Sequence, residues 1–394
     1  MGELPEPVRD VVDLLALGEP LTLTGPGVEE AEARGLVRVD ERLEARLAHP
    51  LYGEVRVQDM GRLRARRLRG VLARRTDDPL RRAVLALDSD LDPDPAGFLA
   101  AAHHALRLSQ LDLTERLARA AGDGFDARLV LAYALTWLSR GEEAEAVLAD
   151  LGDDPRVALP RAGNLFWPLR RAADALAVLD AIPDQDHDVI RAMRVAFTAS
   201  LGHPREAFAE GVRLLDRDLD DQATVVAALG VAAAGAVLGE VAAVRAAAPR
   251  GYRAARSSDA VIVRFGVTDF HLLALRLAGH VSELGALAAE RRAESADVPG
   301  PAQLMGLVLL GQAELAAGRV RTAARVLREA WAGFTAIPEH EFRWRCRPPS
   351  PRPSRSAATP TPAACSPTTP TRRTPSWSPT PASPGRGCRR RRAR

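Results

Sequence analysis

The chain has 394 residues, of which 54 are basic and 51 acidic, for a formal net charge of +3. Every basic residue is arginine, which excludes a conventional phosphate-binding loop, a Schiff-base lysine and a kinase-type lysine. All three cysteines lie at or beyond residue 346, so the preceding part has neither a disulfide framework nor a thiolate metal site. Eleven arginines also lie beyond residue 345, which leaves 43 basic and 51 acidic residues in 1–345, a net charge of −8.

Residues 1–75 are predicted to contain a small winged-helix-like unit. Residues 4–17 have the pattern of an amphipathic helix that opens with prolines, and residues 29–34 form a second helix. Residues 35–39 and 43–47 are predicted to be two short paired strands, because they alternate apolar and polar residues on either side of a turn.

Residues 60–75 are predicted to form an arginine-rich helix with a few leucine and valine residues available for burial. Its candidate nucleic-acid contacts are Arg62, Arg66 and Arg69. Contacts of this kind would reach phosphates, depend on salt and lack sequence selectivity. The alternative interpretation is a solvated helix face, or one that meets acidic neighbours.

Residues 76–107 are predicted to be a helical connector. The run Asp88-x-Asp90-x-Asp92 resembles the start of a calcium loop, but Pro93 and Leu99 stand where that loop needs Gly and a bidentate Glu. We therefore interpret the run as a polar loop with helix-capping acids.

Three histidines are candidate site residues. His103 and His104 are adjacent, so they point to different sides of a helix and do not chelate one ion as an i, i+4 pair does. His49 has no Ser, Cys or paired acid at motif spacing. We expect no catalytic, cofactor-binding or metal-binding residues in this chain, and no enzymatic activity.

Residues 108–345 show a recurring helical hairpin, in which an apolar helix and a short turn precede a second helix that begins with charged residues. The turns recur at about 30 to 40 residues, the range of tetratricopeptide-like two-helix repeats. Such units stack into a continuous core with a concave surface that suits a partner. The predicted turns lie at Gln110-Leu111, Arg140-Gly141, Arg170-Arg171, Leu201-Gly202, Leu238-Gly239, Ala278-Gly279 and Ala317-Gly318.

Large aromatic side chains punctuate these alanine-rich repeats. We interpret them as core residues that fill gaps between closely packed helices, with ligand binding as the alternative. They are Tyr133, Trp137, Phe166, Trp167, Phe208, Phe270, Trp331 and Phe334.

Residues 346–394 differ in composition from the rest of the chain. They contain 12 of the 29 prolines and no Leu, Val, Ile, Asp or Glu, so they are predicted to be a disordered Pro/Arg-rich tail. We favour a shifted reading frame in a GC-rich gene, because rereading the codons in another frame gives a helical pattern after residue 347. A natural low-complexity tail is the alternative, and its Arg389–Arg392 cluster could bind nucleic acid or a membrane nonspecifically.

Six segments occur in a characteristic order, namely Leu4–Val8, Leu14–Leu21, Glu32–Val37, Leu47–Glu54, Glu115–Ala121 and Arg161–Trp167. Together they resemble the region that follows the ATPase module of large actinobacterial LuxR-type transcriptional regulators. The resemblance covers roughly residues 1–345. It implies a winged helix and a helical-repeat sensor arm, which in the family lie between a nucleotide-binding switch domain and a C-terminal helix-turn-helix that binds promoter DNA.

The chain departs from that family pattern in two ways. We expect it to lack both the ATPase module and the DNA-binding helix-turn-helix, so ATP and promoter DNA belong to the full-length family. It also looks short by about a helical turn between Thr24 and Gly25. No catalytic or base-reading residue of the family is therefore assigned here.

The expected protein is all-α, with tetratricopeptide-like repeats forming an α-solenoid behind a winged-helix-like unit. We expect it to be cytoplasmic and not to span a membrane. Its longest apolar region, residues 227–248, is interrupted by charges, and its N-terminus lacks the pattern of a signal peptide. The expected partner of the repeat arm is a small-molecule inducer or a protein. The alternatives are a free-standing protein-interaction scaffold and a DNA-binding protein that uses the winged helix and the basic helix.

Overall fold

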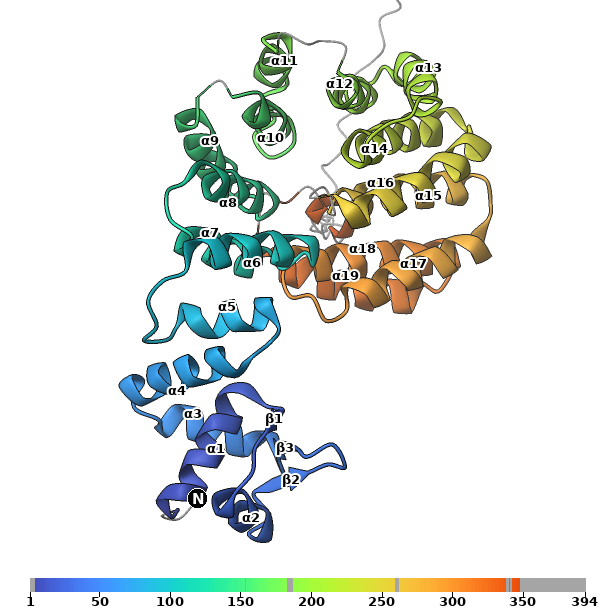
Figure 1. Cartoon of the computed structure of the whole chain (residues 1–394). Coiled ribbons are helices and arrows are strands. Elements are labelled where there is room, and N and C mark those ends of the chain that lie inside the picture. The colour runs from blue at the N-terminus through green and yellow to red at the C-terminus, as the bar shows by residue number, and fades with distance from the viewer. Residues whose placement is uncertain are drawn as a thin grey trace, which may run out of the picture. The chain divides into compact units, whose positions relative to one another are not determined.

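A computed structural model describes residues 4–152, 154–182, 187–258, 262–337, 340 and 342–347. Residues 1–348 form one compact unit. Its described part consists almost wholly of helices (Figure 1), which confirms the predicted all-α class. The predicted disordered and frame-shifted tail lies outside the described residues from residue 348 onward, and the predicted domain boundaries stay predictions.

The N-terminal part combines three helices with a small sheet. Its helices are α1 (Glu6–Gly18), α2 (Pro26–Ala33) and α3 (Pro50–Asp59), and its strands are β1 (Leu21–Thr22), β2 (Val37–Val39) and β3 (Glu44–Leu47). The antiparallel sheet has the order β1-β3-β2, with Leu21 opposite Ala45 and Val37 opposite Leu47. The two predicted helices and the predicted strand pair are present.

Two elements of this unit were missing from the sequence prediction. Strand β1 has only two residues, too few for a period-2 pattern to register. Helix α3 begins at Pro50 and is capped by His49, whose Nδ1 accepts a hydrogen bond from the Leu51 amide at 3.2 Å. Histidine is not among the usual N-cap residues, so this helix start carried a weak signal.

Helix α4 (Arg62–Arg75) is the predicted arginine-rich helix, and α5 (Pro79–Leu87) connects it to the repeats. The Asp13 carboxylate of α1 is fully buried. It accepts hydrogen bonds from Arg56 Nε and Arg64 Nε, each at 2.8 Å. These bonds tie α1, α3 and α4 together through one charged cluster.

Seven tetratricopeptide-like helical hairpins follow, as predicted (Figure 1). In each hairpin the first helix packs against the second, and consecutive first helices also contact one another. The hairpins are α6 (Pro95–Arg107) with α7 (Leu111–Ala120), α8 (Phe125–Trp137) with α9 (Gly141–Asp150), α10 (Pro155–Phe166) with α11 (Ala172–Asp180), α12 (Asp188–Ser200) with α13 (Pro204–Leu215), α14 (Asp221–Leu238) with α15 (Val241–Ser257), α16 (Val263–Leu277) with α17 (Val281–Ser295), and α18 (Pro301–Ala316) with α19 (Val320–Phe334).

All seven predicted turns lie between the two helices of a hairpin. In each turn one residue has a left-handed backbone with φ between 58° and 90°, which closes the first helix and redirects the chain. Glycine accepts this conformation without strain, whereas serine and arginine do not. The residues are Ser109, Ser139, Arg170, Gly202, Gly239, Gly279 and Gly318.

The last hairpins pack against the first ones. One cluster of buried side chains contains Leu106 of α6 together with Met305 of α18, Phe334 of α19 and Phe342 beyond it. The repeat array therefore returns to its own beginning, and the inner faces of the hairpins surround a common space.

Helix α14 is the most deeply buried of the described helices. By length and composition alone it could cross a membrane, but 72% of it is buried inside the protein, as in the core helix of a soluble protein. At Gly230 it approaches α12 so closely that an added Cβ would lie 2.6 Å from Val195 Cγ1 and 3.0 Å from the Ala196 amide nitrogen. This contact fits the expectation that small residues permit close helix packing.

The described chain ends in a short 3-10 helix, η1 (Arg343–Cys346), that packs on α18 and α19. Its last residue, Cys346, belongs to the main core cluster and is only 2% exposed. The composition of the sequence placed Cys346 in the tail, but the structure places it in the core. The compositional argument missed it because one buried residue barely alters the average of a 49-residue segment.

Candidate ligand-binding cavity

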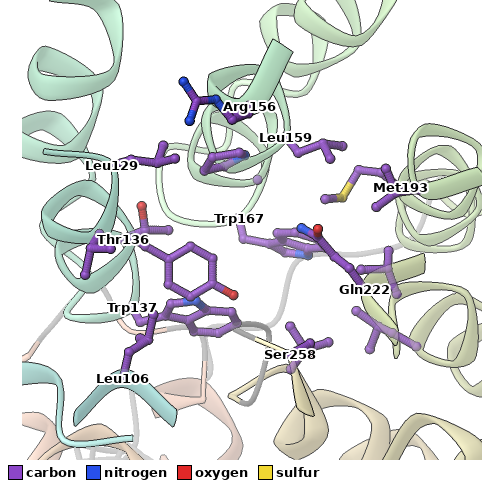
Figure 2. A pocket seen from close by; sticks show the side chains of 18 of the residues that line it. Leu106, Leu129, Thr136, Trp137, Arg156, Leu159, Trp167, Met193, Gln222 and Ser258 are labelled. Atoms are coloured by element: carbon purple, nitrogen blue, oxygen red, sulfur yellow. The ribbon is translucent and has the colours of Figure 1, made fainter. Parts of the chain in front are cut away.

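The inner faces of the repeats enclose a cavity of about 810 Å³ (Figure 2). Its walls come from the first helices α6, α8, α10, α12, α14 and α16 and from adjoining loops, whereas none of its described lining residues lies in α7, α9, α11 or α13. Its apolar lining consists of Leu106, Leu129, Val130, Leu159, Pro160, Pro168, Ile182, Val189, Ile190, Met193, Val226, Leu229 and Val263.

Three large rings line the cavity between these aliphatic side chains. Tyr133 and Trp137 lie one turn apart on α8 with their ring centroids 6.3 Å apart, and Trp167 follows α10. In Figure 2, Trp137 and Trp167 project into the same space. For these three residues the structure therefore supports the alternative to a purely core role, whereas Phe166 and Phe334 are buried core residues.

The Trp167 ring is held in place by two phenylalanines. Phe166 and Phe197 stack in parallel with centroids 3.9 Å apart. Trp167 meets both of them edge-on, at 5.5 Å and 5.2 Å. Edge-to-face and offset aromatic pairs of this kind are favourable, so the orientation of Trp167 is fixed before any ligand enters.

The buried amide of Asn164 on α10 bonds to both α9 and α8 beside this aromatic wall. Asn164 Nδ2 donates to the Gly141 carbonyl at 2.9 Å. Its Oδ1 accepts from Thr136 Oγ1 at 3.3 Å, and Thr136 adjoins Trp137. The shorter bond joins α10 to the first residue of α9, and the longer one joins α10 to α8, which carries Trp137.

The charged groups that line the cavity already have partners. Arg156 Nη1 lies 3.1 Å from Asp126 Oδ1, and its guanidinium covers the Phe125 ring at 4.1 Å. Hydrogen bonds from Arg156 to Asp154 lower the pKa of that carboxyl and raise the pKa of the guanidinium. Asp220 accepts from the Ala223 amide at 2.7 Å and thereby caps α14. Arg156 is therefore shared by two carboxylates, whereas Asp220 is engaged by a backbone amide.

The lining also includes the polar side chains of Ser258 and Gln222. Ser258 is 9% exposed, and its hydroxyl is buried. Gln222 is exposed and lies near Trp167 (Figure 2). A third polar group, His340, is buried, and desolvation lowers the pKa of its imidazole to about 4, so the ring is neutral at ordinary pH.

The predicted nucleic-acid contacts lie on α4, away from this cavity. The guanidinium of Arg66 donates to the Ser89 carbonyl at 2.9 Å and 3.2 Å. Arg62 is exposed and Arg69 is half-buried. Arg66 is thus hydrogen-bonded within the chain although it is exposed, and the contact of the three arginines with nucleic acid stays a prediction.

The histidine and aspartate residues that the sequence offered as candidate metal ligands lie at separate positions in the fold. His103 lines the cavity from α6, and Asp94 caps that helix by accepting from the Gly97 amide at 2.9 Å. Asp88 pairs with Arg116 at 3.1 Å. Among the residues that the structure describes, no group of three or more His, Cys, Asp or Glu side chains is placed to hold a metal ion.

The sequence pointed to the rings of the cavity but not to its polar residues. Tyr133, Trp137 and Trp167 stood out as large side chains among alanines. Ser258 and Gln222 belong to no motif, and their meeting with α8 and α10 depends on how the array closes. One sequence signal could have indicated which helix lies deepest beside the cavity. Helix α14 is apolar on every side, and a helix of this kind is buried all round.

No family model and no curated protein matches the sequence. Among solved structures, the chain is similar to a Signal Transduction ATPase with Numerous Domains (STAND) protein with a tetratricopeptide repeat sensor from Pyrococcus horikoshii, at 11% identity and a TM-score of 0.29. The similarity covers 87% of this chain and 66% of that one, so this chain spans about two thirds of the length of that structure.

Proposed function

We propose that this chain is the signal-receiving part of a LuxR-family transcriptional regulator, and that its repeats bind an inducer inside the cavity. The carrying observation is the cavity of about 810 Å³ lined by aliphatic and aromatic side chains. That volume lies within the range of small-molecule sites, roughly 300–1,000 Å³. The few polar groups among apolar walls are also typical of such sites.

The regulator role rests on the sequence resemblance of residues 1–345. In that role the winged-helix-like unit passes the state of the repeats to a nucleotide switch, with α4 and α5 as the connection. ATP and promoter DNA would be bound by other parts of such a regulator. We place the protein in the cytoplasm and assign it no catalytic role.

The alternative is a scaffold that binds a protein on its repeats. The closure of the array favours a small molecule, because Leu106 and Phe334 share one core cluster and the hairpins surround the inner face. A protein partner would need that face to be open, or would bind elsewhere on the helices.

Fractionated cell extract separates these two possibilities. Extract from the source cells is passed through an ultrafiltration membrane, and the purified chain is mixed with the filtrate or with the retained protein. A small-molecule sensor shows a higher unfolding midpoint and altered tryptophan emission with the filtrate, since bound ligand stabilises the native state. A response to the retained protein alone supports the scaffold. Trp167→Leu should weaken the filtrate response, whereas Trp331→Leu, outside the cavity lining, should leave it intact.

Sequencing the gene and its flanking DNA tests the assignment as a regulator. An independent nucleotide sequence of the locus should show a phosphate-binding-loop ATPase upstream in frame, and further repeats with a helix-turn-helix downstream in a shifted frame. An intact frame without such modules on either side would contradict the LuxR assignment and leave the ligand-binding role to be judged separately.

A further inference from the structure

We infer that His340 is a hydrogen-bond donor of the cavity, and that the ligand meets its Nε2–H group with an acceptor oxygen such as a carbonyl. His340 follows the last repeat helix, α19, and lines the cavity. The inference rests on the proposed function and names the chemical group by which that site binds its ligand.

A hydrogen bond at the other ring nitrogen fixes the tautomer of His340. Its Nδ1 lies 3.2 Å from the amide nitrogen of Phe342. A backbone amide only donates, so Nδ1 accepts, and the single proton of the neutral imidazole lies on Nε2. The ring is neutral at ordinary pH, because desolvation lowers its pKa to about 4. Nε2 is therefore a donor.

This donor has no acceptor within the part of the chain that the structure describes. His340 is only 4% exposed, and its side chain makes one hydrogen bond there, the one at Nδ1. Nε2 nevertheless keeps accessible surface, whereas the hydroxyl of Ser258 is sealed inside the protein. A donor in a largely buried side chain is unfavourable while it lacks a partner, so Nε2–H is available to an acceptor in the cavity.

Aromatic packing holds the imidazole in place before a ligand enters. Its ring centroid lies 4.9 Å from that of Phe334 and 6.1 Å from that of Phe342. Both phenylalanines belong to the core cluster that contains Leu106, another residue of the cavity lining. The donor therefore has a fixed position where the last hairpin meets the first, and pairing with a ligand costs little ordering of the side chain.

The surroundings of His340 make this single donor selective. The Thr136 hydroxyl is already engaged by the Ala132 carbonyl and by Asn164. Most of the remaining lining is aliphatic or aromatic. A ligand that fills these walls and lacks an acceptor would displace water from Nε2 without replacing its hydrogen bond, which lowers affinity.

Two probes of nearly equal shape isolate the acceptor. 2-Acetylnaphthalene carries a carbonyl oxygen where 2-isopropylnaphthalene carries a methyl group. Quenching of tryptophan emission measures the affinity of each for the full chain, in the wild type and in His340→Phe, which keeps a ring but has no donor. We expect the ratio of ketone affinity to hydrocarbon affinity to fall about fivefold to tenfold in His340→Phe, the loss of one hydrogen bond.

His271→Phe is the matched control. His271 is also a buried imidazole, 6% exposed, and desolvation lowers its pKa. Its Nδ1 lies 3.1 Å from the Tyr252 hydroxyl, and it does not line the cavity. This variant should keep the wild-type ratio of the two affinities.

A measurement on the unaltered side chain covers the case in which His340→Phe does not fold. Nitrogen NMR of the chain labelled at histidine reports which ring nitrogen carries the proton, and the signal of His340 is the one lost in His340→Gln. It should show the proton on Nε2. The ketone should shift this proton downfield, whereas the hydrocarbon should not.

The outcomes separate this inference from the proposed function. An unchanged affinity ratio in a folded His340→Phe, or an Nε2 proton that the ketone leaves unshifted, overturns the assigned donor and leaves the cavity as a binding site. If neither probe binds and the extract filtrate has no effect, the proposed function fails, and this inference with it. If only the filtrate acts, it replaces the ketone in the NMR measurement, and an unshifted Nε2 proton overturns the donor alone.

Discussion

The Arg345 guanidinium of η1 pairs with the Asp269 carboxylate of α16, which is 1% exposed. The same guanidinium lies 4.5 Å from the Trp344 ring centroid and 5.7 Å from that of Phe270. This contact fastens the last described turn of the chain to the sixth of the hairpins. It also shows that the sequence up to this point is compatible with the fold, since Phe342 and Cys346 on either side are buried.

Replacing Arg345 with methionine should destabilise the protein by about 3 kcal/mol, because it removes a partner from a buried carboxylate. Urea unfolding followed by circular dichroism measures this change. The control is Arg319→Gln, which removes an exposed pair with Glu314 and should cost less than about 1 kcal/mol. Equal effects of the two substitutions would contradict a structural role for the buried pair.

His340 should make the protein sensitive to acid. Its pKa is about 4 in the folded state and about 6.5 when unfolded. The unfolded state therefore binds more protons between these values, so stability is full above about pH 6.5 and falls by up to about 3 kcal/mol as the pH approaches 4. In His340→Gln the decline across this window should be shallower. His280→Gln, at an exposed imidazole, should keep the wild-type profile, and a similar flattening there would refute the assignment.

Two glycine substitutions within one hairpin should have opposite signs. Gly279 has φ of 77° in its turn, so Gly279→Ala should destabilise the protein by about 1 kcal/mol. Gly285 lies inside α17 with no atom within 4 Å of an added Cβ, so Gly285→Ala should stabilise it by about 0.5–1 kcal/mol. Thermal unfolding of the two variants compares them directly, and a stabilising Gly279→Ala would be incompatible with the left-handed turn.

Removing the Asn164 side chain should lower the stability of the protein more than removing the hydroxyl of its partner Thr136. Asn164→Ala leaves the buried Gly141 carbonyl without its 2.9 Å donor, at a cost of about 2–3 kcal/mol. Thr136→Val removes only the 3.3 Å contact and should cost about 1 kcal/mol or less. Chemical denaturation of both variants tests the order.

The repeat pattern could be found in the sequence because its signals are local. Gly202, Gly239, Gly279 and Gly318 mark left-handed turns, and Pro204 marks a first helical turn. At Ser139 and Arg170 the same conformation is adopted without glycine, and the prediction there depended on the apolar helices on both sides. The start of α3 had a weaker local signal in the sequence, since its N-cap residue, His49, is an unusual one.

The sequence by itself determined the helical hairpins of the repeats and the small residues that permit close packing, because these follow from spacing and backbone preference within a few residues. Only the tertiary structure decided that Trp137 and Trp167 face a cavity, that Ser258 completes its wall, and that Arg345 reaches Asp269. Each of these depends on the summed rotation from one hairpin to the next. A small change in that rotation would move side chains from distant helices apart, although each hairpin would keep its local sequence pattern.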